Sequence, residues 1–360
     1  MIQCTAMKAI YGKKVFVAMS GGVDSSVAAA LLKKQGFSVT GVYMKPWSPY
    51  AKASEGHSNL CMWKEDREDA MRAATILNIP FLTWDFSREY KKEVADYMIK
   101  EYKSGRTPNP DIMCNKHIKF GLFLKNALKE GADFIATGHY VQKDRNRLLI
   151  SKDKNKDQSY FLWTLTQEQL KYSLFPVGEY TKPEVRKMAK KFGLPNHDKK
   201  DSQGVCFVGP INMADFLKTY ITPKKGKIID SSTGSEQGKI IGEHDGAFYY
   251  TIGQRHGLNI GNGAGPYFVT KKDLKKNIVY VGREKDLLSQ KTGIKDLNWL
   301  KKVKLPTKLE VKIRYRSKSE KAILKRNGFL EFIKPQRAIT SGQSAVFYRG
   351  QELIGGGIIR

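Results

Sequence analysis

The stretch Ala18-Met-Ser-Gly-Gly-Val-Asp-Ser-Ser26 lies between the apolar run Val15–Met19 and the Ala- and Leu-rich run Ser26–Gln35. This order predicts a strand, a tight glycine turn and a helix. Paired glycines let backbone N–H groups approach an anion closely, the serine hydroxyls add donors, and the helix N-terminus contributes about half a positive charge. Asp24 stands among these donors, where it either orients the loop or helps to hold Mg²⁺ beside a polyphosphate. We therefore predict a phosphate-binding loop.

The spacing of this loop excludes two common nucleotide-binding motifs. It is not G-x-x-x-x-G-K-[ST], because no lysine follows the glycines to reach a γ-phosphate, and it is not G-x-G-x-x-G. A loop of this kind suits enzymes that release pyrophosphate from a nucleotide. The alternative is a glycine turn that binds nothing. That alternative is disfavoured because open α/β sheets bind ligands at the carboxyl ends of their strands, where this loop lies.

The segments that follow the loop alternate between strand and helix patterns. Apolar, β-branched runs at 38–44, 81–86 and 132–139 predict strands, and the runs at 65–78 and 88–103 predict helices. This rhythm is typical of α/β domains that have a mostly parallel sheet with helices on both faces. We therefore expect an α/β catalytic domain over residues 1–215.

The composition of the chain changes from about Tyr220, where glycine becomes frequent and the helical periodicity of apolar residues fades. Short β-like runs appear there, such as Phe248–Ile252 and Tyr267–Thr270. A further set of such runs predicts a small antiparallel barrel at the C-terminus, namely Asn277–Val281, Leu309–Tyr315, Ala322–Leu324, Leu330–Ile333 and Ser344–Tyr348. We place a small central domain at 216–275 and the β-barrel at 276–360.

The charge balance indicates an acidic partner. The 360 residues include 63 Lys and Arg against 35 Asp and Glu, a formal net charge of +28, and residues 276–360 alone hold 20 against 7. Nucleic acid is the first candidate, ahead of an anionic membrane and of a merely lysine-rich proteome. No apolar run approaches the roughly 18–20 residues that a membrane span needs. Residues 1–14 lack the pattern of a signal peptide, so we expect a cytoplasmic protein.

The four cysteines are Cys4, Cys61, Cys114 and Cys206, and none forms a C-x-x-C pair. This spread predicts neither a disulfide framework nor a cysteine-rich zinc site. In a reducing cytoplasm a working cysteine acts as a thiol.

Cys114 and Cys206 stand in distinctive surroundings. Pro108 and Pro110 interrupt any helix before Cys114, and Asp111 and Cys114 lie three residues apart as the next helix begins. The basic neighbours Lys116, His117 and Lys119 favour a thiolate at Cys114, whereas a helix cap for Asp111 and a small buried side chain for Cys114 are the alternatives. Cys206 lies between Gly204 and Gly209, which would allow a thiol to travel, although an ordinary strand residue remains equally open.

Residues Ser20–Ser25 complete the S-G-G-x-D-S fingerprint of the PP-loop ATP pyrophosphatases, which have an adenine nucleotide alpha hydrolase-like fold. From about Lys14 to the C-terminus the chain resembles one family within them, the tRNA-specific 2-thiouridylases. The motifs that carry this resemblance are Ser20–Ser25, Arg106–Cys114, Thr137-Gly-His-Tyr140, Lys156-Asp-Gln-Ser-Tyr160, Asp201–Cys206 and Tyr250-Thr-Ile-Gly-Gln-Arg-His-Gly257. The stretch 45–64 departs from the family pattern, so no role is carried over for Cys61.

The resemblance implies a role for each matching position. Cys114 would be the nucleophile, Cys206 would carry a persulfide, and Asp111 would be an acid or base. The ATP-binding residues would be Ala18, Met19, Ser20, Gly21, Gly22, Val23, Asp24, Ser25, Met44 and Gly138. Asn109, Pro110 and Asp111 would meet the target base, and Lys156, Asp157, Gln158, Arg314 and Tyr315 would contact tRNA.

The implied reaction puts sulfur on C2 of the wobble uridine of tRNA. ATP, with Mg²⁺, would adenylate the C2 oxygen and release pyrophosphate, and the persulfide on Cys206 would then attack C2. Cys114 would either free sulfide or resolve the adduct, leaving a Cys114–Cys206 disulfide. We expect a monomer that receives sulfur from a persulfide donor, a cysteine desulfurase or a sulfur-relay protein. A GMP-synthetase-like ligase for a small metabolite and a non-catalytic RNA-binding protein are the rival hypotheses.

Overall fold

The computed structural model of the chain describes residues 11–49, 62–200, 213–231, 238–261 and 265–360. The chain divides into two compact units, each described by itself below. The first comprises Met1–Val94, Pro110–Pro210 and Gln351–Ile354, and the second comprises Ala95–Asn109, Ile211–Gly350 and Gly355–Arg360.

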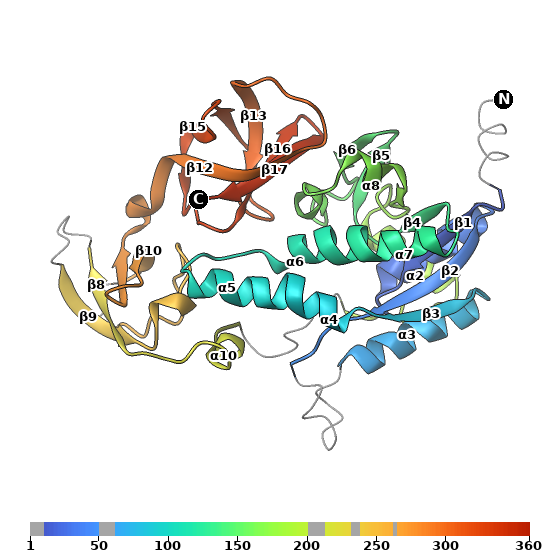
Figure 1. Cartoon of the computed structure of the whole chain (residues 1–360), viewed down its shortest axis with the longest axis horizontal. Helices are drawn as coiled ribbons and strands as arrows, with labels where there is room; N and C mark the ends of the chain where they lie inside the picture. Colours follow the sequence, from blue (N-terminus) through green and yellow to red (C-terminus); the bar gives the residue numbers. More distant parts are fainter. Residues whose placement is uncertain (1–10, 50–61, 201–212, 232–237, 262–264) are drawn as a thin grey trace, which may run out of the picture. The chain divides into compact units, whose positions relative to one another are not determined.

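The first unit is built on a parallel five-stranded sheet with the strand order β3-β2-β1-β4-β7 (Figure 1). Its strands are β1 (Lys14–Ala18), β2 (Ser38–Lys45), β3 (Phe81–Asp85), β4 (Phe134–Ala136) and β7 (Ser173–Leu174). β1 pairs with β2 on one side and with β4 on the other. The strand order therefore reverses at β1, and the carboxyl end of such a strand is where open α/β sheets bind ligands.

Helices cover both faces of this sheet because side chains alternate along β1. Val15 and Val17 join a buried core with residues of α2, α3 and α9. Phe16 points the other way, to Trp84, whose ring also contacts Phe123 of the opposite helical layer. The predicted α/β sheet with two helical layers is thus confirmed. The helical segments of this unit are α2 (Val23–Lys34), α3 (Met62–Ile76), α4 (Ser87–Tyr90), α6 (Pro110–Met113), η3 (Cys114–Phe123), α7 (Leu124–Lys129), η4 (Ser159–Leu162), α8 (Gln167–Lys171) and α9 (Lys182–Lys191), with β5 (Val141–Asp144) and β6 (Arg147–Ile150) forming a hairpin.

The second unit contains a four-stranded sheet with the order β10-β11-β8-β9. Its elements are α5 (Tyr97–Lys103), which continues η2 (Lys91–Asp96), α10 (Met213–Lys218), β8 (Gly226–Asp230), β9 (Lys239–His244), η5 (Ala247–Tyr249), β10 (Phe268–Asp273) and β11 (Ile278–Gly282). The predicted strand over Phe248–Ile252 is wrong. Gly246 (φ 148°) and Gly253 (φ 84°) have backbone conformations that interrupt an extended segment, so a short 3-10 turn forms instead.

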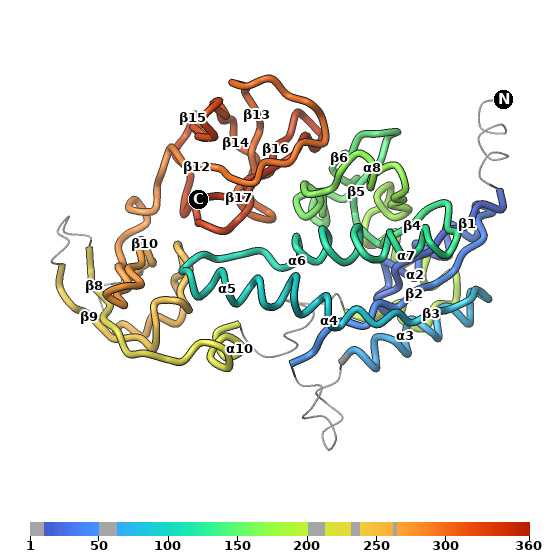
Figure 2. Tube along the Cα trace, viewed as in Figure 1, coloured from blue at the N-terminus to red at the C-terminus, as the bar shows by residue number. Residues whose placement is uncertain are grey.

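A closed antiparallel barrel completes the second unit, and Figure 2 shows its trace in orange and red. Its strands follow the order β12-β15-β14-β13-β16-β17, and pairing between β12 and β17 closes it, which confirms the predicted barrel. The predicted barrel strand Asn277–Val281 is wrong in its placement, because Ile278–Gly282 forms β11 of the four-stranded sheet. The strands are β12 (Leu288–Trp299, after η6, Glu284–Leu287), β13 (Thr307–Lys312), β14 (Glu320–Leu324), β15 (Phe329–Arg337), β16 (Ser344–Arg349) and β17 (Glu352–Ile359).

One predicted barrel strand extends too far. β13 ends at Lys312, whereas the sequence pattern predicted a strand over Leu309–Tyr315. Arg316 has a φ of 64°, and the N–H of Ser317 bonds the carbonyl of Arg314, so these residues form a turn. The predicted C-terminal end of this strand is therefore wrong.

Candidate active site

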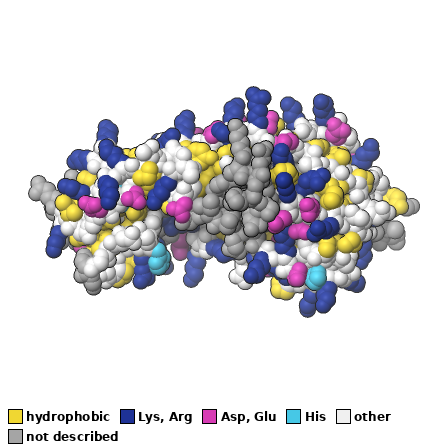
Figure 3. Space-filling model, turned by 90° about the horizontal axis from the view of Figure 1, so that it is seen from below, with side chains coloured by type: hydrophobic (Ala, Val, Ile, Leu, Met, Phe, Trp, Pro, Cys, Tyr) yellow, Lys and Arg dark blue, Asp and Glu magenta, His cyan; other side chains and the backbone are white. Residues whose placement is uncertain are grey.

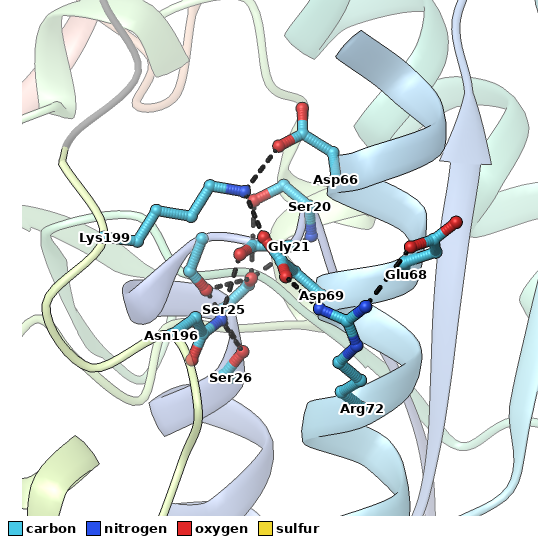
Figure 4. A network of polar contacts seen from close by, with 11 residues as sticks. Ser20, Gly21, Ser25, Ser26, Asp66, Glu68, Asp69, Arg72, Asn196 and Lys199 are labelled. Atoms are coloured by element: carbon cyan, nitrogen blue, oxygen red, sulfur yellow. Dashed lines mark hydrogen bonds and ion pairs between the residues drawn. The ribbon is translucent and has the colours of Figure 1, made fainter. Parts of the chain in front are cut away.

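The glycine loop lies at the carboxyl end of β1 and leads directly into α2 (Figure 4). Gly21 has a φ of 77°, and a Cβ there would lie 2.2 Å from the carbonyl oxygen of Asp66, so only glycine fits. Hydroxyls fasten the turn: Ser25 Oγ accepts from the N–H of Ser20 at 3.2 Å and donates to the carbonyl of Gly22 at 3.1 Å. The loop is thus held by its own serines in the shape that the sequence predicted for anion binding.

Asp24 is bound by two side chains from elsewhere in the first unit. The ammonium of Lys182 lies 2.7 and 2.9 Å from the two carboxylate oxygens, and the hydroxyl of Tyr140 donates to Oδ1 at 2.8 Å. The Lys182 side chain is only 9% exposed. Of the two roles that the sequence left open for Asp24, these contacts favour orientation of the loop.

We expect Lys182→Met to lower the free energy of unfolding by about 3 kcal/mol, because it leaves the carboxylate of Asp24 in a half-buried position without its cation. Adding Asp24→Asn should recover part of that loss, since an amide needs no cation. Urea denaturation of the two single variants, the double variant and the parent measures this coupling, and strictly additive effects would contradict it. Lys152→Met is the matched control. Lys152 forms an exposed ion pair with Glu184, which lies on α9 like Lys182, so the loss of this pair should change stability little.

The other predicted nucleotide residues come from the strands beside β1. Met44 stands near the carboxyl end of β2, and Gly138 follows β4. A Cβ on Gly138 would lie 2.7 Å from the backbone nitrogen of Ser25, so this glycine allows close packing against the start of α2. The structure therefore brings the loop, Met44 and Gly138, which the resemblance assigns to ATP binding, to the carboxyl ends of three neighbouring strands.

His139 is a buried histidine next to this edge. Its Nδ1 lies 2.8 Å from the hydroxyl of Thr137, and its ring contacts Phe120 and Phe175. Desolvation holds the pKa of His139 well below its ordinary value, so the ring is neutral at physiological pH. A neutral ring enclosed by aromatic side chains is typical of a histidine that packs in the protein interior.

Asp111 and Cys114 lie one helical turn apart on a continuous helical stretch. Pro110 begins this stretch, and its fixed φ suits the first helical position, where no N–H bond is needed. Desolvation raises the pKa of the half-buried Asp111 carboxyl, an effect that the positive charge of Lys119 partly opposes. Cys114 begins the segment η3, and its side chain is buried, 6% exposed. An acid with a raised pKa thus accompanies a thiol on one turn.

One of the three basic neighbours predicted for Cys114, His117, carries little positive charge in the structure. Desolvation, with a contribution from Lys116, lowers the pKa of His117, while Glu93 at 3.8 Å opposes this shift. At neutral pH His117 is therefore largely uncharged, so any charge that favours a thiolate comes from the lysines. Cys206, the whole segment Asp201–Gly209, Cys4 and Cys61 lie outside the described residues.

The loop that precedes Asn109 is anchored within the second unit. Arg106 donates two hydrogen bonds of 2.6 Å to Glu101. The N–H of Thr107 bonds the carbonyl of Ser341, and its own carbonyl accepts from Gln343 Nε2 at 2.9 Å. These bonds fix the backbone immediately before the residues that the resemblance assigns to the target base.

Two sets of predicted tRNA contacts also have structural partners. Asp157 is buried and accepts hydrogen bonds from the N–H groups of Ser151 and Ser159, and Gln158 Oε1 accepts from the N–H of Tyr140 at 2.9 Å. Arg314 donates through Nη2 to the carbonyls of Ile252 and Ala338 and to the hydroxyl of Thr340. These side chains therefore stabilise the loops around them.

Three residues near the glycine loop have no counterpart in the sequence prediction. Lys182 contacts Asp24. Figure 4 shows the other two: Asn196 contacts the loop backbone, and Lys199 forms ion pairs with Asp66 and Asp69. The sequence signal at Lys182 is the capping box Thr181–Glu184, which marks the start of α9 but not its neighbour. No local pattern reveals these contacts, because they join residues at least 130 positions apart.

Positive charge is spread widely over the surface. Figure 3 shows one face on which Lys and Arg side chains are dispersed among neutral ones rather than gathered into one patch.

Within the described ranges, no group of three His, Cys, Asp or Glu side chains is arranged to hold a metal ion. None of the helices in that part of the chain combines the length and the apolarity that a membrane crossing requires.

Three family models match the chain in succession. They are described as a tRNA methyl transferase HUP domain (residues 13–210), a tRNA methyl transferase PRC-barrel domain (214–283) and an aminomethyltransferase beta-barrel domain (289–359). Among solved structures, a 4-thiouridine synthetase in complex with RNA and ATP covers 57% of this chain and 50% of its own, at 20% identity and a TM-score of 0.37. That likeness is too distant to carry an argument.

Curated relatives match over nearly their whole length. Proteins named tRNA-specific 2-thiouridylase MnmA from Flavobacterium johnsoniae, Karelsulcia muelleri and Bacillus licheniformis are 43%, 46% and 44% identical. In each case 96% of this chain is covered, together with 100%, 98% and 94% of the relative. Such identity over all three domains exceeds what a shared fold alone produces. The chain therefore belongs to the family of tRNA-specific 2-thiouridylases.

Proposed function

We propose that the chain is an ATP-dependent tRNA-uridine 2-sulfurtransferase that acts on the wobble uridine. The observation that carries this proposal is the presence, in one α/β unit, of the S-G-G-V-D-S loop and of a thiol one helical turn from an acid of raised pKa. Family membership supports the same activity, because the relatives are named for tRNA-specific 2-thiouridylation.

The chemistry requires each of these groups. The C2 carbonyl of uridine is a poor electrophile, so its oxygen must become a leaving group before sulfur can enter. Adenylation achieves this, and the pyrophosphate released would lie at the N–H groups where α2 begins. The outer sulfur of the Cys206 persulfide then bonds to C2 as AMP leaves. The Cys114 thiolate attacks the Cys206 sulfur, so that the sulfur–sulfur bond breaks and a Cys114–Cys206 disulfide forms, and Asp111 moves a proton.

The phosphates of ATP, rather than a set of protein side chains, would bind Mg²⁺. The carboxylates near the loop are engaged by ammonium groups, Asp24 by Lys182, and Asp66 and Asp69 by Lys199. This arrangement does not fit a protein-bound metal, so no step of the reaction is derived through one.

Two other activities fit the site less well. A tRNA methyl transferase, the activity in the descriptions of two family models, has no use for a pyrophosphate-releasing loop or for a pair of thiols. A GMP-synthetase-like ligase would not need the basic C-terminal barrel. Sulfur transfer to tRNA uses all three features.

A reconstituted reaction tests the proposal. The protein is incubated with Mg·ATP, a persulfide donor and unmodified tRNA that carries a wobble uridine, and the products are analysed for 2-thiouridine and AMP. We expect both in equal amounts, together with pyrophosphate. Consumption of ATP without thiolation of uridine, or thiolation without ATP, would contradict the assignment.

We expect tRNA binding to weaken steeply with salt, because 20 Lys and Arg face only 7 Asp and Glu in residues 276–360. The logarithm of the affinity should fall linearly with the logarithm of salt, with a slope of about −0.7 to −0.9 for each phosphate contacted. Filter binding between about 50 and 200 mM salt measures the slope. A slope near zero would show that these charges do not contact the RNA backbone.

A further inference from the structure

The turn that follows α9, residues 194–199, presents polar side chains to the glycine loop (Figure 4). Asn196 is 4% exposed, and its Nδ2 donates to the carbonyl of Gly21 at 2.9 Å and to the hydroxyl of Ser26 at 3.0 Å. The hydroxyl of Ser26 in turn donates to the carbonyl of Gly22 at 3.1 Å. One amide group therefore holds two successive loop carbonyls, the first directly and the second through a serine.

The direction of these carbonyls determines the direction of the N–H groups that follow them. In a trans peptide the C=O and the next N–H point to opposite sides. A Gly21 carbonyl turned toward Asn196 turns the N–H of Gly22 away from it, and a Gly22 carbonyl held by Ser26 does the same for Val23. Gly22 is the N-cap of α2, so both N–H groups belong to the helix end where an anion is stabilised.

The turn itself is fastened on two sides. Lys199 lies 2.7 Å from Asp66 and 2.6 Å from Asp69 of α3, and these hydrogen bonds outweigh desolvation and raise the pKa of Lys199. Arg186 of α9 donates to the carbonyls of His197 and Lys199 at 3.1 and 2.9 Å. Because the turn is held by both helices, Asn196 acts on the loop from a fixed position.

We propose that Asn196 is a positioning residue of the nucleotide site, which holds the Gly21–Gly22 and Gly22–Val23 peptides with their N–H groups toward the phosphates. This inference rests on the proposed function, in which those phosphates belong to ATP. Asn196 acts through the loop backbone, so its effect falls on the phosphate end of the ligand and not on the adenosine.

Calorimetric titration of the full-length protein with Mg·ATP, and separately with inorganic pyrophosphate, tests the inference. Asn196→Leu keeps the size of the side chain and removes both donors. We expect it to weaken the binding of both ligands by the same factor, roughly tenfold to a hundredfold. If leucine prevents folding, Asn196→Asp replaces it, since a carboxylate also lacks the donors that hold Gly21 and Ser26.

Asn115→Leu is the matched control for a merely structural effect. Asn115 is also buried, at 2% exposed, and its Nδ2 donates to a backbone carbonyl, that of Phe161, at 3.2 Å. We expect Asn115→Leu to lower the melting temperature like Asn196→Leu but to leave both affinities unchanged. If the parent binds both ligands and the Asn196 variants bind them equally well, the inference is wrong and the proposed function stands. If the parent binds neither ligand, the proposed function itself fails.

Discussion

Cys114→Ser is expected to lower the rate of tRNA thiolation by roughly 10³-fold or more, the scale seen when a covalent nucleophile is removed. Serine has nearly the size of cysteine, so the buried position at the start of η3 should be preserved. Cys206→Ser should abolish thiolation as well, because no persulfide can then form. Both variants should still bind ATP, since neither residue belongs to the glycine loop.

The species that accumulates in Cys114→Ser distinguishes two orders of events. If the terminal sulfur of the Cys206 persulfide attacks C2 directly, AMP leaves and a Cys206–S–S–uridine adduct forms. In the parent, the Cys114 thiolate then attacks the Cys206 sulfur, and 2-thiouridine leaves. Without Cys114 this adduct should persist. If instead Cys114 first attacks the Cys206 sulfur and releases sulfide, the variant should form no adduct. Either route ends in a Cys114–Cys206 disulfide. A thiol reductant then reduces this disulfide with two electrons and restores both thiols.

A single-turnover reaction resolves the two orders. Persulfide-loaded protein is mixed with labelled tRNA and Mg·ATP, and the products are separated on a non-reducing gel. A protein–tRNA band that disappears with dithiothreitol, present in Cys114→Ser and absent in Cys206→Ser, indicates direct attack by the persulfide. Cys61→Ser serves as the control and should react like the parent. Multiple turnovers by either of the first two variants at the rate of the parent would contradict the two-thiol mechanism.

The parts of the fold that the sequence predicted correctly are those set by local pattern. β1, the glycine turn and α2 form one continuous signal, because an apolar run, two glycines and a helical run each act over a few residues. The barrel strands that went unnoticed, β12 and β17, are the two that close it. β17 contains Gly355-Gly-Gly357, which reads as a break in a strand. In the fold, however, a Cβ on Gly355 would lie 2.3 Å from the carbonyl oxygen of Asn298 in β12. The glycine that weakens the local signal is required by the distant partner.

The same reasoning explains which site residues were missed. Asp111 and Cys114 could be predicted together because three positions on a helix form one turn. Lys182 and Asn196 reach the glycine loop across 158 and 175 residues of sequence. Such contacts depend on α9 packing against α2, and a single sequence contains no pattern that specifies that packing. The loop could therefore be predicted from its own residues, but the side chains that orient it could not.

Asp111→Asn is expected to abolish thiolation and, at neutral pH, to stabilise the fold. An acid or base positioned at a reacting group contributes roughly 10²- to 10⁴-fold to a rate, so the loss of activity should be of that order. The change in stability has a separate cause, because desolvation raises the pKa of the Asp111 carboxyl in the folded protein. A carboxyl of raised pKa contributes stability below its ordinary pKa and loses that contribution as the pH rises through the raised value. Above the ordinary pKa of a carboxyl, the desolvation of Asp111 therefore costs the folded protein free energy, and asparagine does not have this cost.

The pH dependence of the melting temperature provides the test. The advantage of Asp111→Asn over the parent should be largest near neutral pH and should shrink as the pH falls toward the ordinary pKa of a carboxyl, because the parent then becomes protonated as well. Asp133→Asn is the control of opposite sign. Hydrogen bonds from Lys13 and from the N–H of Lys14 lower the pKa of Asp133, so its replacement should destabilise the protein more at neutral pH than at acidic pH. A lower melting temperature of Asp111→Asn at pH 7 would contradict the desolvation of this carboxyl. A thiolation rate equal to that of the parent would contradict its role in proton transfer. An inactive but stabilised variant is what a residue retained for chemistry rather than for folding should give.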